Sequence, residues 1–168
     1  MIEAAMIEAL LTYEGSTMKK IIFILATLFA GFFATNSYAQ FAKPDDAAKY
    51  RQSALTVMAN HFGRVGAMVA GRVPFDAKVA QENLDIAVSL SKLPWAGFGP
   101  SGEGATIKTS AKPEIWKDQA KFKDLSEKMQ AELIKVQTAA KTGSLDSIKA
   151  AFGGVGASCK ACHDAFRN

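Results

Sequence analysis

The sequence predicts an all-α protein, an antiparallel up-and-down four-helix bundle. Four stretches carry apolar residues at three- and four-residue spacing, which is the pattern of helices with one buried face. Two short connections and one long one join these stretches, as antiparallel neighbours in a bundle require. No run alternates between apolar and polar residues as a strand does, and the chain has no internal repeat.

Residues 18–39 have the three parts of a secretory signal peptide. Met18 is followed by two lysines, residues 21–33 are apolar, and residues 37–39 form a small-x-small cleavage site. The apolar run is shorter than the about 20 residues that a membrane span needs. We therefore predict cleavage after Ala39, export to the periplasm, and a mature protein without a membrane anchor. An uncleaved signal anchor is the alternative.

Residues 1–17 look unlike a targeting segment and are interpreted as an upstream mis-start, with translation from Met18; a genuine start at Met1 is the alternative. Residues 40–168 are long enough for one domain with a single core. The full chain has 20 Lys and Arg against 16 Asp and Glu. Two of these bases and three of these acids precede residue 40, so the mature net charge is about +5.

The charges are interspersed rather than blocked, as on solvated helix faces, so no nucleic-acid partner is predicted. A mildly positive surface favours an acidic redox partner, whose identity the sequence does not reveal.

The first helix is predicted over residues 44–70. Pro44 suits its first turn, and two aspartates follow near the positive helix end. Gly71 and Pro74 end it. One buried face is expected to hold Tyr50, Ala54, Val57, Met58, His61, Phe62, Val65 and Met68.

The second helix is predicted from the N-cap Asp76 to about Leu93, where Pro94 stops it. Its inward face is expected to hold Val79, Ala80, Leu84, Ala87, Leu90 and Leu93.

A connection of unusual length, residues 94–113, follows the second helix. Connections of this length in compact domains are either functional or loosely ordered. Trp95 and Phe98 lie between prolines and glycines, so residues 94–100 are interpreted as a lid over something flat and apolar. Residues 101–112 are expected to be exposed.

The third helix is predicted over residues 114–142, and Ser144 is expected to cap a fourth. The buried face of the third helix would hold Trp116, Phe122, Leu125, Met129, Leu133, Val136 and Ala140. The inner face of the fourth helix would hold Leu145, Ile148, Phe152, Val155, Cys159, Cys162, His163 and Phe166.

Three glycines, Gly153, Gly154 and Gly156, interrupt the predicted fourth helix. Each costs about 1 kcal/mol in a helix relative to alanine. We therefore expect a neighbouring helix or a bound group to approach the backbone closely there.

The run Cys159-Lys160-Ala161-Cys162-His163 is the attachment motif of a covalent haem. Two cysteines at i and i+3 on a helix can form thioethers to one edge of the macrocycle, and the histidine can ligate the iron. One covalent haem c is therefore predicted. The alternatives are a redox pair, which would open the first helix of a βαβ unit, and a zinc site that recruits His61.

Three segments resemble the cytochromes c′ of proteobacteria: CKACHDAFR at 159–167, YRQSAL at 50–55 and LPWAGFGP at 93–100. The resemblance spans the mature chain. It implies a bundle with covalently attached haem, periplasmic location, and a homodimer paired through the first two helices.

The resemblance also implies an iron without a sixth protein ligand. In six-coordinate relatives a methionine stands at the position of Leu55, so this iron is expected to be five-coordinate and to bind nitric oxide or carbon monoxide at an apolar site. The protein is interpreted as a gas-binding haem protein capable of electron transfer, not an enzyme. The alternative is an electron carrier with Met58 as sixth ligand. Met129 and His61 are further candidate ligands, and His61 is the only candidate distal base of a peroxidase.

The remaining site residues are also assigned by resemblance. Arg51 and Gln52 are expected to hold haem propionates, and Arg167 to lie over the proximal imidazole. Trp95 and Phe98 are expected to line the haem edge. The alternatives are a solvated Arg51, a frayed Arg167, and aromatics that only pack helices.

Overall fold

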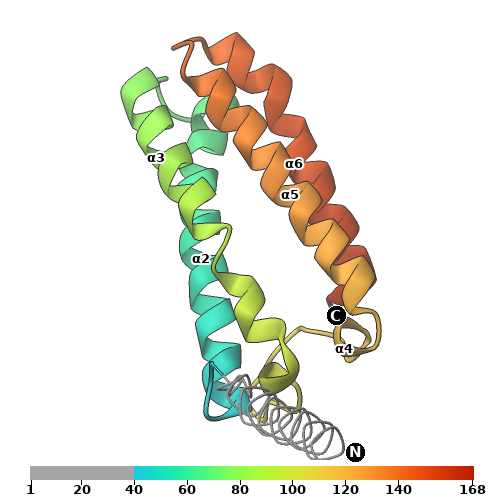
Figure 1. The fold of residues 1–168 in the computed structure, drawn as a ribbon. Coiled ribbons are helices and arrows are strands. Elements are labelled where there is room, and N and C mark those ends of the chain that lie inside the picture. The colour runs from blue at the N-terminus through green and yellow to red at the C-terminus, as the bar shows by residue number, and fades with distance from the viewer. Residues whose placement is uncertain (1–39) are drawn as a thin grey trace, which may run out of the picture. The chain divides into compact units, whose positions relative to one another are not determined.

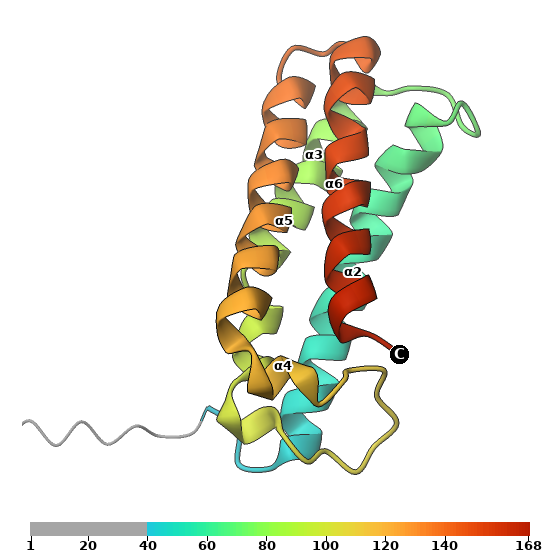
Figure 2. The same ribbon diagram turned by 90° about the vertical axis from the view of Figure 1, so that its right-hand side faces the viewer.

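A computed structural model describes residues 40–168 (Figures 1 and 2). Every regular element within this part is helical. The elements are the α-helices α2 (Pro44–Val69), α3 (Ala77–Leu90), α4 (Glu114–Lys117), α5 (Gln119–Ala140) and α6 (Leu145–Phe166), and the 3₁₀ helices η1 (Pro94–Phe98) and η2 (Pro100–Gly102).

The four long helices form an antiparallel bundle, which confirms the predicted fold. Helix α2 pairs with α3, α5 pairs with α6, and α3 packs on α5, whereas α2 and α6 touch each other at few points. In the described part, no helix combines the length and apolar character needed to cross a membrane. The predicted start site, signal peptide and cleavage site lie outside the described residues.

The predicted helix starts are confirmed. Helix α2 begins at Pro44. The Asp76 side chain accepts a hydrogen bond from the Val79 amide at 2.9 Å, and Ser144 caps α6 through the Ser147 amide at 3.3 Å. These side chains accept bonds from amides that the helices themselves leave unpaired.

Helix α3 ends at Leu90, three residues before the predicted end. Pro94 has no N–H group to donate to the Leu90 carbonyl, and the Leu93 amide instead donates to that carbonyl in a tighter turn. Two predicted core residues, Val79 and Leu93, are exposed. The polar Asn83 is buried on the inward face instead.

The prediction of one continuous helix over 114–142 is wrong. Asp118 leaves the helical region, with φ −128° and ψ 62°, and its side chain accepts a hydrogen bond from the Lys121 amide. Aspartate competes with the helix in this way because its short side chain can replace the first carbonyl acceptor. The chain therefore forms the short helix α4 before α5 begins.

Two groups of buried apolar residues hold the bundle together. The larger, here called the bundle core, contains Met58, Val65, Met68, Ala80, Leu84, Ala87, Met129, Leu133, Val136, Ala140, Ile148 and Val155. The smaller, here called the aromatic cluster, contains Phe98, Ile115, Phe122 and Phe166. Val57, which was predicted to be buried with the first group, is exposed.

Of the three glycines of α6, one meets the expectation that a neighbouring element approaches the backbone closely. Gly154 faces the Glu132 side chain of α5 so closely that a Cβ atom would collide with it, whereas Gly153 and Gly156 meet no neighbour within 4 Å. On α2, a Cβ at Gly66 would lie 3.1 Å from the ring of Phe152. Glycine therefore admits the ring at one of the few points where α2 and α6 meet.

Residues 101–112 were expected to be exposed, but Gly102 is buried and several others, such as Ile107, are partly buried. The segment is hydrogen-bonded to α2, so a loosely ordered connection is ruled out. Asp45 accepts hydrogen bonds from the Thr106 amide at 2.6 Å and the Thr106 hydroxyl at 2.8 Å. The Gln52 amide donates to the Lys108 carbonyl at 2.9 Å.

Replacing Asp45 with asparagine is expected to lower the thermal midpoint at neutral pH. Hydrogen bonds from the Thr106 hydroxyl and amide hold the pKa of the Asp45 carboxyl below its ordinary value. A lowered carboxyl pKa contributes stability above about pH 4, and this is lost as the pH falls through the folded-state pKa. The difference between variant and wild type should therefore shrink in melts below about pH 4.

Asp46→Asn is the matched control, since Asp46 lies in the same first turn and is exposed. An equal effect of both substitutions at every pH would assign the loss to the helix dipole and contradict the role of Thr106.

Candidate functional site

The predicted attachment residues lie in the last two turns of α6. Cys159 and Cys162 are unpaired and partly buried, and burial raises the pKa of both thiols. Cys159 packs against the bundle core and Cys162 against the aromatic cluster. The two sulfur atoms are thus presented from one helix along the line where the two groups meet.

His163 follows the second cysteine directly. His163 is exposed, so its predicted place on the inner face of the fourth helix is wrong, because the residue after Cys162 points about 100° further round the helix. Loss of part of its hydration and the positive charge of Arg167 lower the pKa of the His163 imidazole, and Asp164 opposes this with a smaller effect. The balance favours the neutral imidazole, which is the form that binds a metal through a ring nitrogen.

Leu55 of α2 and Trp95 of η1 lie where the two apolar groups meet. Both pack against the bundle core and the aromatic cluster, as only residues at the boundary can. We call this boundary, with Leu55, Trp95, Cys159 and Cys162, the seam. The structure therefore brings together residues that are about a hundred positions apart in the sequence.

Arg51 lies one turn before Leu55 and is only 1% exposed, so a solvated surface arginine is ruled out. Its Nη1 donates to the Gly97 carbonyl at 2.6 Å and to the Gly102 carbonyl at 3.1 Å. Its Nη2 is buried and has no hydrogen-bond partner in the described part of the chain. Burial lowers the pKa of this guanidinium from its ordinary value.

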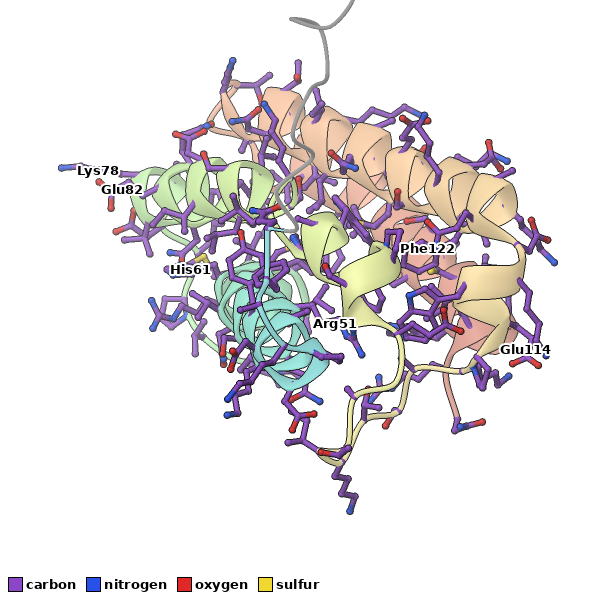
Figure 3. The ribbon with its side chains drawn as sticks, turned by 60° about the horizontal axis from the view of Figure 1, so that its bottom comes forward. Arg51, His61, Lys78, Glu82, Glu114 and Phe122 are labelled. Atoms are coloured by element: carbon purple, nitrogen blue, oxygen red, sulfur yellow. The ribbon has the colours of Figure 1, made fainter. Side chains whose placement is uncertain are left out.

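Two aromatic rings flank the same guanidinium. Its central carbon lies 4.7 Å from the ring centroid of Phe98 and 5.5 Å from that of Trp116. Figure 3 shows Arg51 extending from α2 toward the segment that carries Phe98. These contacts are within the range of cation–π attraction.

Glycines complete the surroundings of Arg51. A Cβ at Gly97 would lie 2.6 Å from the Ala47 carbonyl oxygen and 3.0 Å from the Arg51 Cβ. A Cβ at Gly102 would collide with the Gly97 carbonyl oxygen and lie 3.0 Å from the Arg51 Nη1. Neither Gly102 nor the contact of Trp116 was predicted, because nothing in the local sequence pattern pairs either residue with α2.

The other predicted site residues occupy different surroundings. Phe98 is buried in the aromatic cluster, with its ring centroid 4.8 Å from that of Phe122. Arg167 is exposed and follows α6, where it pairs with the backbone of Ala111 and its amide donates to the His163 carbonyl at 2.9 Å. The side-chain amide of Gln52 is bonded to the connection rather than directed to a charged group.

The other candidate iron ligands, two methionines and one histidine, make other contacts. Met58 and Met129 belong to the bundle core. His61 Nδ1 lies 2.8 Å from Asn83 Oδ1, and the Asn83 amide nitrogen donates to the Val79 carbonyl, so His61 is assigned as the donor in a link to α3. Residues 40–168 contain no group of three His, Cys, Asp or Glu side chains suited to a metal ion, so zinc bound through His61 finds no support.

A family model described as Cytochrome C' matches residues 46–167, nearly all of the described part. The chain belongs to the cytochrome c′ family. It is 55% identical over 128 residues to cytochrome c′ of Alcaligenes xylosoxydans xylosoxydans, covering 76% of this chain and 98% of that protein. Identity to cytochrome c′ of Rubrivivax gelatinosus is 53% over 128 residues, with the same two coverages.

Solved cytochrome c′ structures share the fold. The crystal structure of the Rubrivivax gelatinosus protein has a TM-score of 0.72 at 52% identity and covers 77% of this chain and all of that one. A nitric oxide complex of a leucine-to-alanine mutant of the Alcaligenes xylosoxidans protein has a TM-score of 0.71 at 53% identity, and covers 77% of this chain and 98% of that one.

As a cytochrome c′, the protein carries one haem c, attached covalently through Cys159 and Cys162. The residues present fit this group. The seam offers apolar side chains on both sides of the two cysteines. The buried Nη2 of Arg51 lacks an acceptor within the described residues, and a propionate carboxylate is the acceptor that a guanidinium binds best.

Replacing Gly102 with alanine is expected to destabilise the protein by about 1–3 kcal/mol, the usual range for a side chain forced into packed surroundings. The added methyl would displace the Gly97 carbonyl from the Arg51 guanidinium. Chemical denaturation of the haem-loaded protein measures the loss.

Gly153→Ala is the control for this substitution. That glycine is helical and meets no neighbour within 4 Å, so alanine should stabilise the protein by up to about 1 kcal/mol. Equal stability of Gly102→Ala and wild type would contradict the close fit around Arg51.

Proposed function

We propose that this cytochrome c′ is a periplasmic haem protein whose iron is five-coordinate, with His163 as its protein ligand. It binds nitric oxide or carbon monoxide at an apolar distal site and is capable of electron transfer. The observation that carries the proposal is Leu55, an aliphatic side chain at the seam that reaches both apolar groups from the helix opposite α6.

The absence of a donor atom on Leu55 supports an open iron position. A leucine side chain cannot ligate iron, and the two methionines and the histidine that could replace it are held in the bundle core or bonded to α3. An open position accepts small gases, whereas a filled one favours electron transfer alone.

An apolar distal side also favours some gases over others. Leu55 offers no hydrogen bond to stabilise bound oxygen and disfavours polar or anionic ligands. Nitric oxide and carbon monoxide need no such bond. One relative at 53% identity, the Alcaligenes xylosoxidans protein, has been solved as nitric oxide complexes of two mutants in which a leucine is replaced by alanine or isoleucine. This supports nitric oxide as a ligand here.

The propionates are assigned to the end of α2. Arg51 Nη2 is the proposed donor, because it is buried and has no partner among the described residues. Gln52 is the second proposed residue, with its amide already bonded to the Lys108 carbonyl. On the proximal side, the Arg167 amide donates to the His163 carbonyl, which supports the proposal that Arg167 lies beside the imidazole.

A catalytic role is not proposed. Peroxidase chemistry requires a distal acid or base. His61 is the candidate for that role, and it donates its Nδ1 hydrogen to Asn83 of α3. We infer that the protein binds and releases its ligand without transforming it.

Absorption spectra of the ferric and ferrous protein, with and without carbon monoxide, test this function. We expect a high-spin ferrous spectrum that changes on addition of carbon monoxide. Leu55→Ala should speed carbon monoxide binding, because it removes the side chain proposed to cover the distal side and leaves a cavity there.

Met58→Ala serves as the control and should leave the coordination unchanged, since Met58 packs in the bundle core. A low-spin, methionine-ligated ferrous spectrum that changes in Met58→Ala would instead support the six-coordinate electron carrier.

We also propose a homodimer formed through the first two helices. Three large apolar side chains on these helices are exposed: Val57, Val79 and Ile86 at 45%, 37% and 41%. Exposed apolar side chains that gather on one pair of helices favour association with a second copy of the chain.

Ile86→Glu is expected to convert the dimer to a monomer in sedimentation velocity at micromolar concentration, because it places a charge in the interface. Ile134→Glu on α5 is the control, at 47% exposure on the other helix pair. Dissociation caused by Ile134→Glu but not by Ile86→Glu would show that the interface lies on α5 instead.

A further inference from the structure

Helix α4 has four residues and is separated from α5 by Asp118. Its Trp116 is the residue that contacts Arg51 from the α5 side of the molecule. We propose that Trp116 is a positioning residue: together with Phe98 it fixes the plane of the Arg51 guanidinium so that Nη2 points to a haem propionate, and it thereby sets the haem reduction potential. This inference rests on the proposed contact between Arg51 and a propionate.

The hydrogen bonds of Arg51 leave its orientation incomplete. Both bonds are made by Nη1, to the carbonyls of Gly97 and Gly102. They fix one corner of the guanidinium, and Nη2 makes no hydrogen bond to the described residues. The plane of the Arg51 guanidinium can therefore rotate about an axis through Nη1 unless packing against other side chains holds it.

Two aromatic rings pack against the guanidinium. Phe98 and Trp116 lie 4.7 Å and 5.5 Å from the guanidinium carbon. An arginine stacks on aromatic faces through its planar guanidinium, and the attraction strengthens when water is excluded, as it is around a residue that is 1% exposed.

Trp116 is itself anchored to the segment that bonds Arg51. Its Nε1 donates to the Gly99 carbonyl at 3.1 Å. Just beyond α4, Gln119 donates to the carbonyls of Phe98 at 3.2 Å and Ile115 at 2.9 Å. The ring is thus tied to η1 and η2, which supply the two carbonyl acceptors of Arg51.

The orientation of Arg51 has an electrostatic consequence. In residues 40–168 no carboxylate forms an ion pair with this buried cation. The negative charge of a propionate held by Nη2 would be compensated by the guanidinium. The propionate would also stay ionised at low pH, because a neighbouring cation lowers a carboxyl pKa. A propionate that loses this contact adds negative charge near the iron, which stabilises the ferric state and lowers the potential.

Trp116→Leu should therefore lower the reduction potential at pH 7. We expect the ratio of ferric to ferrous protein at fixed potential to rise by about tenfold, which corresponds to about 59 mV for a one-electron couple. The potential should also fall as the pH rises between about 3.5 and 5.5, where the wild type should change less, because a propionate released from Arg51 would titrate near the ordinary carboxyl pKa of about 4.

Two variants separate positioning from packing. Trp116→Phe keeps a ring and should recover most of the wild-type potential. Ile115→Ala removes a neighbouring buried side chain of α4 that has no aromatic ring to stack on Arg51, and should lower stability without the potential change. A potential shift in Ile115→Ala as large as in Trp116→Leu would overturn the proposal.

A second readout observes Arg51 directly. In the diamagnetic ferrous carbon monoxide form, NMR signals of the Arg51 guanidinium hydrogens should lie upfield because of the two rings. They should move toward ordinary arginine positions in Trp116→Leu. Unchanged Arg51 signals in this variant would show that Trp116 does not hold the guanidinium.

Arg51→Gln distinguishes this inference from the function on which it rests. If Arg51→Gln lowers the potential and Trp116→Leu does not, the propionate contact stands and the positioning role of Trp116 is wrong. If neither variant changes the potential, the contact between Arg51 and a propionate is itself wrong.

Discussion

Burial of the Arg51 charge is the constraint on which the packing of η1, η2 and α4 against α2 depends. A cation removed from water costs several kcal/mol unless hydrogen bonds and an opposite charge compensate it. The protein supplies two carbonyls and two rings and leaves Nη2 without an acceptor among the described residues. The 3₁₀ segment, the long connection and α4 all serve these contacts. The proposed contact with a haem propionate would supply the missing acceptor.

The bundle core and the aromatic cluster have different roles in the structure. The bundle core joins all four long helices and holds the methionines that might otherwise reach the iron. The aromatic cluster closes the end near the chain terminus, where Phe166 meets Phe122. Leu55 and Trp95 lie between the two groups with the attachment cysteines. The cofactor therefore belongs to the packing of the molecule, and its loss should weaken the fold as well as the function.

The long helices could be predicted because their signals are local. Proline and aspartates at 44–46, the caps Asp76 and Ser144, and apolar spacing over 145–166 are read within one or two turns of the chain. The failures arose where distant or competing contacts decide. Asp118 broke the third helix although the apolar spacing continued through it. Asn83 took an inward position because His61 of α2 bonds to it.

The sequence by itself determined the class of fold and the haem attachment through Cys159 and Cys162. These depend on residue type and on spacing within single helices. Only the tertiary structure decided that Arg51 is buried rather than solvated, and that Gly102 and Trp116 belong to its surroundings. Those contacts join segments 46 to 65 residues apart, and no local pattern specifies which side chain a loop will bring across that distance.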